Sequence, residues 1–547
     1  MRRTGALVFT LLASALPALP AAADSSPPVV DTPAGKVMGV APGGVRSFRG
    51  IPYALPPTGA MRWKPPLPMP KWTGTRDATQ FGAACVQPKG KPDSIYLWNL
   101  PKTSEDCLYL NVWAPANARK AAVFVWIHGG ALSAGASSEP LYDGTKLAER
   151  GIVVVTINYR LGPLGFLVHP ALSAESPHNV SGNYGLLDQI EALGWVKRNI
   201  AAFGGDPRNV TIAGESSGGL SVMYLMAAPS ARGLFARAIA QSAYMVSAQE
   251  LRTTPHGGFA GEAVGPWLAE KLGAGDLAGL RSMDAQKITD GAAALGFFPF
   301  FVIDGHLLPR QIVDVFDRGE QARVPLLAGF NSGEIRSLRA LAPPVPADAA
   351  TYEKEIRNRY QDLADAFLKL YPSRDLQESI WATTRDSLYG WTAERLMTRH
   401  TAAGVPSFLY LFDHGYPAAD EKGMHAFHAS ELPYVFGTAD KAPPNWPKVP
   451  TTAVEANLSN AMLDYWSSFA RTGAPSAAGQ PPWPAYGTER AYMAFEDVPR
   501  AKTHLMPGMY EFNEQVVCRR RAAGGIPWHW NVGLASPPLP PQAPQCR

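Results

Sequence analysis

A serine flanked by glycines is the first residue of this sequence whose setting suggests chemistry. Residues 214–218 read GESSG, with Ser216 at the centre, between the β-branched run NVTIAG and the helical pattern GGLSVMYLMA. Small residues on both sides allow a tight strand-to-helix turn that exposes the serine hydroxyl. The first N–H groups of the following helix would stabilise negative charge at the same place. We therefore predict that Ser216 is a nucleophile, and a glycine-rich turn with a spare serine is the alternative.

A serine hydroxyl needs a base to activate it and an acid to orient that base, and after such a turn both are expected later in the chain. Glu334 and then His428 each follow a strand-like apolar run. We expect His428 to accept the Ser216 proton and return it to the leaving group, while Glu334 fixes the imidazole tautomer. On position alone, His425 is an alternative base. An ordinary histidine pKa of about 6.5 predicts a rate that rises as this imidazole loses its proton, unless the site shifts the pKa.

A glycine loop earlier in the chain is suited to binding the oxygen of a reacting carbonyl group. Residues 128–132 read HGGAL and follow the apolar run AAVFVWI. The two glycines would let backbone N–H groups turn toward that oxygen, together with the N–H group of Ser217. An HGG segment alone is also typical of a tight turn. Its position ahead of GESSG in chain order favours an oxyanion hole.

The elements that must position these residues indicate an α/β protein. Near-continuous apolar runs suit strands that are buried on both faces of a mainly parallel sheet. Such runs lie at 121–127, 151–158, 209–214, 324–330 and 407–413. Helical periodicity fills the interval between the second and third runs, and Gly204 and Gly205 supply a helix stop there. Residues 245–300 and 335–400 lack strand rhythm, and we expect them to form helical cap insertions that shape a substrate entrance.

Composition is that of a compact globular protein. The 547 residues are 46% hydrophobic and 18% charged, with a formal net charge of +4. No long block of Lys and Arg alternates with aromatic residues, so we expect no nucleic-acid partner. The basic run 519–521 is predicted to be a solvated surface turn. Because no internal repeat or long linker divides the chain, we expect one catalytic domain over residues 24–547.

The first 23 residues are typical of a secretory signal peptide. Arg2 and Arg3 precede a short apolar stretch, and three alanines precede Asp24. The stretch is interrupted by Pro17 and is short for a bilayer span. We expect cleavage after Ala23 and a secreted or periplasmic protein without a stable membrane anchor.

The four cysteines favour disulfides over a metal site. No CxxC motif and no paired Cys/His spacing are present, and an exported chain meets an oxidising environment. Proximity in the chain favours Cys85 with Cys107 and Cys518 with Cys546. The two crossed pairings remain alternatives, and the Pro-rich C-terminal end would be a loose tail unless Cys546 ties it down.

Many motifs in a fixed order resemble the type B carboxylesterase and cholinesterase family of α/β-hydrolases. They are FRGIPYALPP, SEDCLYLNVWAP, WIHGGA, NYRLGPLGFL, GNYGLLDQ, FGGDPRNVTIAGESSGG and HASELPYVFG. The resemblance implies a large, mostly parallel sheet flanked by helices, with helical cap insertions. It also implies hydrolysis of carboxylic esters through an acyl-enzyme on Ser216, with no metal or organic cofactor. Because the family's histidine lies three residues before a glutamate, it selects His428, ahead of Glu431, over His425.

The same resemblance assigns further residues. It implies oxyanion-hole donors at Gly130, Ala131 and Ser217, with Ala131 standing where the family often has a third glycine. The pair Cys85 and Cys107 matches the family's first loop disulfide. Arg49 with Glu105 resembles a structural ion pair.

Three aromatic residues are implied to face the substrate. Trp98 resembles the tryptophan that faces the choline cation in cholinesterases, and Phe297 and Phe298 lie where the family lines its acyl pocket. Loop packing is the alternative for Trp98 and core packing for the two phenylalanines.

Two other functions remain open beside ester hydrolysis. The same residues would serve hydrolysis of amides or carbamates. Some family members are non-catalytic adhesion or binding proteins that have lost the serine or the histidine, whereas Ser216 and His428 are both present here. The expected partner is a small-molecule ester.

Overall fold

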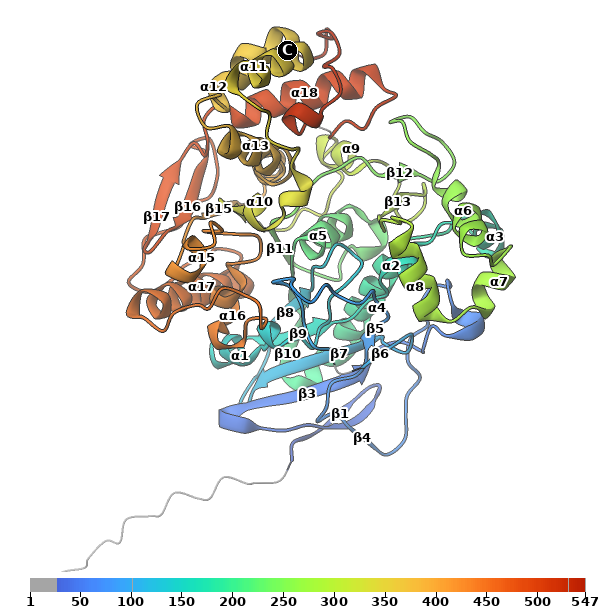
Figure 1. Cartoon of the computed structure of the whole chain (residues 1–547). Coiled ribbons are helices and arrows are strands. Elements are labelled where there is room, and N and C mark those ends of the chain that lie inside the picture. The colour runs from blue at the N-terminus through green and yellow to red at the C-terminus, as the bar shows by residue number, and fades with distance from the viewer. Residues whose placement is uncertain (1–26, 101, 530, 547) are drawn as a thin grey trace, which may run out of the picture.

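A ten-stranded sheet is the centre of the molecule (Figure 1). The structure, a computed structural model, describes residues 27–100, 102–529 and 531–546. The strand order is β17-β16-β15-β14-β11-β10-β8-β9-β7-β3. From β9 to β16 every neighbouring pair is parallel, and antiparallel strands complete both edges. The bounds are β3 (Val45–Pro52), β7 (Tyr109–Pro115), β8 (Ala121–Ile127), β9 (Val153–Ile157), β10 (Gly205–Glu215), β11 (Arg237–Gln241), β14 (Leu326–Asn331), β15 (Ser407–Phe412), β16 (Ala491–Phe495) and β17 (Pro499–Thr503). The mostly parallel α/β sheet expected from the sequence is confirmed.

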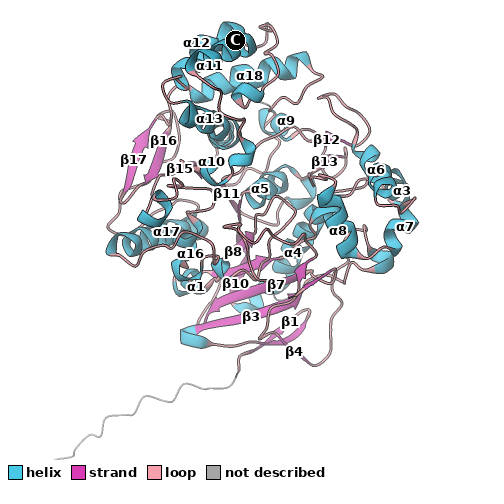
Figure 2. Cartoon of the chain, viewed as in Figure 1, coloured by secondary structure: helices cyan, strands magenta, loops and turns pink. Residues whose placement is uncertain are grey.

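Side chains of the central strands enter two cores, one on each face of the sheet. Along β8, Val123 and Val125 belong to one buried cluster, whereas Phe124 and Trp126 belong to the other. This alternation is the two-residue period of a strand. Helix α5 (Ser217–Ala227) packs on β10 and β11 in the first core, and α17 (Ala453–Thr472) packs on β8 and β10 in the second. Helices therefore cover both faces, which explains why the strands read as continuous apolar runs (Figure 2).

The predicted helix stop lies where the chain turns back into the sheet. Helix α4 (Tyr184–Asn199) continues as a 3-10 turn over Ile200–Phe203. Gly204 ends that turn with a left-handed φ of 89°, and Gly205 begins β10. The strand that carries the serine motif therefore starts at a defined residue.

The two segments without strand rhythm contain helices, as expected, although the first also contains the short strand β12 (Gln249–Glu250). The first contains α6 (Val264–Lys271), α7 (Leu277–Ser282) and α8 (Ala285–Ala294), which share a separate small core. The second contains α11 (Ala349–Tyr360), α12 (Ala364–Leu370), α13 (Leu376–Arg385) and α14 (Trp391–Ala402). Figure 1 shows the two groups at different borders of the molecule, with α11 and α12 beside α18 (Met509–Ala523).

Both expected disulfides are present, Cys85–Cys107 and Cys518–Cys546. The second closes the C-terminal segment back onto α18, so this Pro-rich segment is tied down.

The prediction of a solvated turn at residues 519–521 was wrong. These arginines lie in α18, where Arg519 and Arg520 are only 2% and 0% exposed. Arg519 pairs with Asp362 at 2.6 Å. The partner lies far away in the chain, so the local sequence gave no sign of this burial.

A second expectation was also wrong, because Glu105 does not pair with Arg49. Arg62 makes that contact, at 2.6 Å, and the Arg49 guanidinium instead lies over the ring of Phe81.

Among the described residues no helix has the length and apolar character needed to cross a bilayer. The expected signal peptide and its cleavage position after Ala23 lie outside the described residues.

Candidate active site

Ser216 occupies a strained turn between β10 and α5. Its φ and ψ are 57° and −124°, a combination that non-glycine residues rarely adopt. The flanking glycines are sterically required. A Cβ on Gly214 would lie 2.5 Å from the backbone of Gly218, and a Cβ on Gly218 would lie 2.1 Å from the carbonyl oxygen of Ile127. The GESSG pattern therefore encodes a close crossing of β10, α5 and β8 that holds the serine at the end of the sheet.

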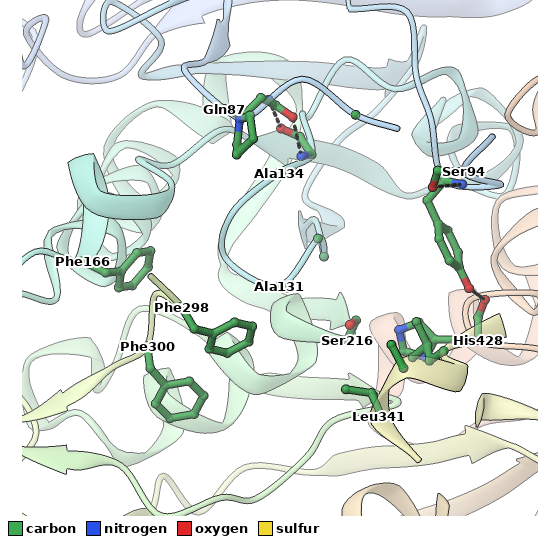
Figure 3. Close-up of a pocket in the computed structure, with 18 of the residues that line it drawn as sticks. Gln87, Ser94, Ala131, Ala134, Phe166, Ser216, Phe298, Phe300, Leu341 and His428 are labelled. Atoms are coloured by element: carbon green, nitrogen blue, oxygen red, sulfur yellow. Dashed lines mark hydrogen bonds between the residues drawn. The ribbon is translucent and has the colours of Figure 1, made fainter. Parts of the chain in front are cut away.

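The predicted oxyanion loop runs beside this turn. Gly130 and Ala131 both have positive φ, 103° and 55°, and the N–H group of Leu132 donates to Ser217 Oγ at 3.1 Å. That bond fixes the loop to the start of α5. Within the described part of the chain, the N–H groups of Gly130 and Ala131 have no protein acceptor. The Ser217 N–H group opens α5 and so has no acceptor within the helix. The structure thus brings the three expected donors to one place, and Figure 3 shows Ala131 beside Ser216.

The acid and the base come from loops that follow β14 and β15. Glu334 opens the short helix α10 (Glu334–Ser337) and is completely buried. Its Oε1 accepts the N–H group of Asn331 at 2.8 Å, and its Oε2 contacts His428 Nδ1. The carbonyl oxygen of His428 accepts the Tyr96 hydroxyl at 3.0 Å. Because parallel strands end at the same edge of a sheet, Ser216, Glu334 and His428 meet there although they are far apart in sequence.

The alternative histidine lies elsewhere. His425 is half-exposed and contacts two aspartates, Asp413 at 3.2 Å and Asp420 at 3.0 Å. Glu431 braces the loop that carries His428, since it accepts hydrogen bonds from Asn331 at 2.7 Å and from Gln241 at 2.9 Å. The contact with Glu334 therefore distinguishes His428 from His425.

Sequence reasoning missed one residue of this site, Glu215. Its Oε1 lies 3.0 Å from His428 Nε2, on the side of the ring opposite Glu334. Burial raises the pKa of Glu215 above its ordinary value, and the positive charge of a protonated His428 opposes that shift. Burial alone would lower the pKa of His428, but the carboxylates of Glu215 and Glu334 outweigh it and raise that pKa to about 9. The available signal was a carboxyl group directly before the nucleophile in GESSG.

A cavity of about 1700 Å³ contains Ser216 and His428 in its wall. The three aromatic residues expected to face substrate, Trp98, Phe297 and Phe298, also line it. Phe298 is 64% exposed, which rules out core packing for this residue. Phe297 and Trp98 also pack against buried clusters, so they serve both the cavity and the packing. Figure 3 shows Phe298 and Phe300 on one side of Ser216 and His428 on the other.

Comparison with known proteins identifies the family of this chain. The model of the carboxylesterase family matches residues 26–513. The chain belongs to the carboxylesterase family. It is 38% identical to the para-nitrobenzyl esterase of Bacillus subtilis (strain 168), covering 84% of this chain and 93% of that protein. It is 36% identical to the fumonisin B1 esterase of Sphingopyxis macrogoltabida, covering 90% and 91%.

Solved structures agree with this assignment. A PNB esterase structure matches with a TM-score of 0.76 and 35% identity, covering 87% of this chain and 97% of that chain. A thermophilic PNB esterase matches with the same TM-score and 34% identity, covering 89% and 100%. The fold is therefore that of the α/β-hydrolases, and the protein is a serine hydrolase of carboxylic esters, whose substrates are small molecules.

Proposed function

We propose that this carboxylesterase works through Ser216 as nucleophile, His428 as general base and Glu334 as the acid that orients the base. One observation carries the assignment: a fully buried carboxylate contacts one imidazole nitrogen beside a serine held in a strained turn. Since Glu334 accepts at Nδ1, the proton of the neutral ring resides there and Nε2 keeps a lone pair. That lone pair is what removal of the serine proton requires.

The reaction proceeds in two halves. Ser216 Oγ bonds to the carbonyl carbon of the ester while its proton passes to His428 Nε2. The oxyanion accepts hydrogen bonds from the N–H groups of Gly130, Ala131 and Ser217, which have no competing acceptor in the described structure. As the carbon–oxygen bond to the alcohol breaks, the alcohol takes the proton from Nε2. A water molecule, activated by the same nitrogen, then releases the carboxylic acid and restores Ser216.

The substrate sits with its leaving alcohol toward His428 and its acyl group toward Phe298 and Phe300. The alcohol must lie within proton-transfer distance of Nε2, and these phenylalanines line the opposite side of Ser216 (Figure 3). The exposed aromatic ring of Phe298 favours an apolar acyl group. Trp98 lies with Tyr142 and Trp446 among the other lining residues, and these side chains would contact the alcohol group.

Replacement of the nucleophile tests the assignment. Ser216→Ala should abolish the burst of nitrophenol from a p-nitrophenyl ester and the acylation of the peptide that contains residue 216. The matched control is Ser282→Ala, which changes an exposed serine at the end of α7 that does not line the cavity. The control should retain full activity. Turnover that survives in purified Ser216→Ala would refute the assignment, and a wild-type protein without turnover would favour a binding function.

We also propose that residues 24–547 form one exported catalytic domain. The two disulfides support an oxidising compartment, and the N-terminal residues resemble a signal peptide cleaved after Ala23. N-terminal sequencing of the protein secreted by an expressing cell should begin at Asp24. A mature protein that begins at Met1 would contradict the proposal.

A further inference from the structure

The C-terminal segment after α18 contributes a side chain to the wall of the catalytic cavity. The carboxylesterase family model ends its match at residue 513, whereas His529 lines the cavity that contains Ser216. His529 is half-buried. A residue beyond the matched part of the chain therefore borders the space where the ester is bound.

This segment is firmly held. The side chain of Trp528 is completely buried and packs edge-on against Trp391. Asn531 accepts the Tyr360 hydroxyl at 2.6 Å and donates to Asn513 at 2.6 Å. Farther along, Leu539 enters the small core formed by α11, α12 and α18, and the Cys518–Cys546 disulfide closes the segment. His529 is thus presented from an anchored backbone.

The hydrogen bonds of His529 fix its tautomer. The backbone N–H group of Ser247 donates to Nδ1 at 3.0 Å, and the Ser247 hydroxyl lies 3.0 Å from the same nitrogen. An imidazole nitrogen that accepts from a backbone N–H group carries a lone pair, so in the neutral ring the proton is on Nε2. Burial, with the positive charge of Arg520 nearby, lowers the pKa of His529 to about 3. The ring therefore stays neutral, with Nε2 as a hydrogen-bond donor, over the working pH range.

Within the described residues the Nε2–H group has no protein partner, although Nδ1 is occupied. We place the ring on the acyl side of the cavity from the position of its partner Ser247. Gln249 of the strand pair β12 (Gln249–Glu250) and β13 (Val302–Ile303) is in parallel register with Val302. Ser247 and Phe300 each lie two residues before this ladder in the chain, and both line the cavity. An unoccupied donor therefore lies in the wall of the cavity that Phe298 and Phe300 also line.

We propose that His529 is a specificity-determining residue whose Nε2–H group donates a hydrogen bond to an oxygen in the acyl group of the substrate. The preferred substrate class is an ester whose acyl chain carries a hydroxyl, ether or carbonyl oxygen away from the scissile bond. A plain alkyl chain would cover the donor without pairing it, and a covered donor left unpaired weakens binding of the transition state. This proposal rests on the proposed triad, since the acyl side is defined by the positions of Ser216 and His428.

The test compares matched esters. The probes are p-nitrophenyl hexanoate and analogues in which one chain methylene is replaced by an ether oxygen at successive positions. Each kcat/KM is divided by the hydroxide-catalysed hydrolysis rate of that ester, which removes differences in intrinsic reactivity. For at least one oxygen position the wild-type enzyme should prefer the ether analogue by about tenfold.

Replacement of His529 should remove this preference. His529→Phe keeps an aromatic ring without a donor, and in this variant the ratio of the two normalised kcat/KM values should fall to about one. His529→Leu provides the donor-free side chain if the Phe variant does not fold. The matched control is His306→Phe, an exposed histidine that does not line the cavity, and it should retain the wild-type ratio.

Three results would overturn the proposal: a wild-type enzyme without preference at any position, an unchanged ratio in the donor-free variants, or an equal loss for both esters, which indicates a structural role. Failure of the triad assignment is distinguishable, because it would appear as residual turnover of both esters in Ser216→Ala.

Discussion

Glu334→Gln tests the triad most sharply, because the structure dictates how the new side chain would orient. Glu334 Oε1 accepts the backbone N–H group of Asn331 at 2.8 Å, and Oε2 faces His428 Nδ1. The amide oxygen of glutamine must take the first position, since two donors would otherwise meet. Its NH2 group then points at Nδ1, which must become an acceptor. The imidazole proton moves to Nε2, where the base needs its lone pair.

The expected loss of kcat depends on how strongly the variant stabilises the inactive tautomer, in which the proton is on His428 Nε2. Turning the amide around would place its NH2 group against the Asn331 N–H group in a site with no exposure, at a cost of about 1–3 kcal/mol. Glu215, 3.0 Å from Nε2, would accept the misplaced proton and stabilise the inactive form further. The equivalent change in serine-protease triads lowers kcat by about 10⁴, and we expect a similar loss here, about 5.5 kcal/mol of activation free energy.

The assay is the pre-steady-state burst and steady-state kcat with a p-nitrophenyl ester, together with thermal unfolding of each variant. Glu334→Asp, which retains the carboxylate, should recover part of the activity, and the isosteric Gln variant should unfold within a few degrees of the wild type. A correctly folded Glu334→Gln enzyme that keeps more than about 1% of wild-type kcat would refute the tautomer argument.

Three further changes probe the same site. Glu215→Gln removes a charge that stabilises the protonated imidazole of His428, so the pKa of His428 should fall from about 9. The acid limb of the kcat/KM profile should therefore move to lower pH, and an unmoved limb would count against this coupling. His428→Ala should lower kcat by at least about a thousandfold and His425→Ala by less than about threefold, and the reverse ranking would identify His425 as the base. Gly218→Ala places a Cβ 2.1 Å from the Ile127 carbonyl oxygen, so the free energy of unfolding should fall by about 1–3 kcal/mol in a denaturant titration. A variant as stable as the wild type would show that this turn has room for a side chain.

Local patterns in the sequence were sufficient to predict the sheet and the tight strand-to-helix turn at Ser216. Strands buried on both faces are continuous apolar runs, and the glycines around Ser216 are required by contacts within 2.1 to 2.5 Å of backbone atoms. Prediction of Glu334 and His428 also required the order of the motifs along the chain. These two residues lie close together because they follow neighbouring parallel strands, not because they are near in sequence. The choice between His425 and His428 required a family pattern, since both have acidic neighbours and only one lies at the buried carboxylate.

Other features depend on pairings that no local pattern encodes. Arg519 reads as surface, yet Asp362 pairs with it across 157 residues of chain. Glu215 was visible beside Ser216, but its contact with His428 joins segments more than 200 residues apart. Sequence periodicity predicts which face of an element is buried, whereas the partner of a buried charge is set by how the elements pack.

The C-terminal segment shows both why local sequence patterns fail to predict long-range contacts and how a selectivity residue can lie apart from the proposed triad. It has no apolar periodicity, so it reads as a tail, and its order arises from one disulfide, one buried tryptophan and hydrogen bonds to helices distant in the chain. Ser216, Glu334 and His428 are fixed by the ends of central strands, and any shift of these strands would disturb both cores. His529 is instead held by the terminal segment and by its contact with Ser247. On the roles proposed for these residues, residue 529 can change without moving Ser216, Glu334 or His428, so selectivity would be adjusted in this segment at little cost to the reaction.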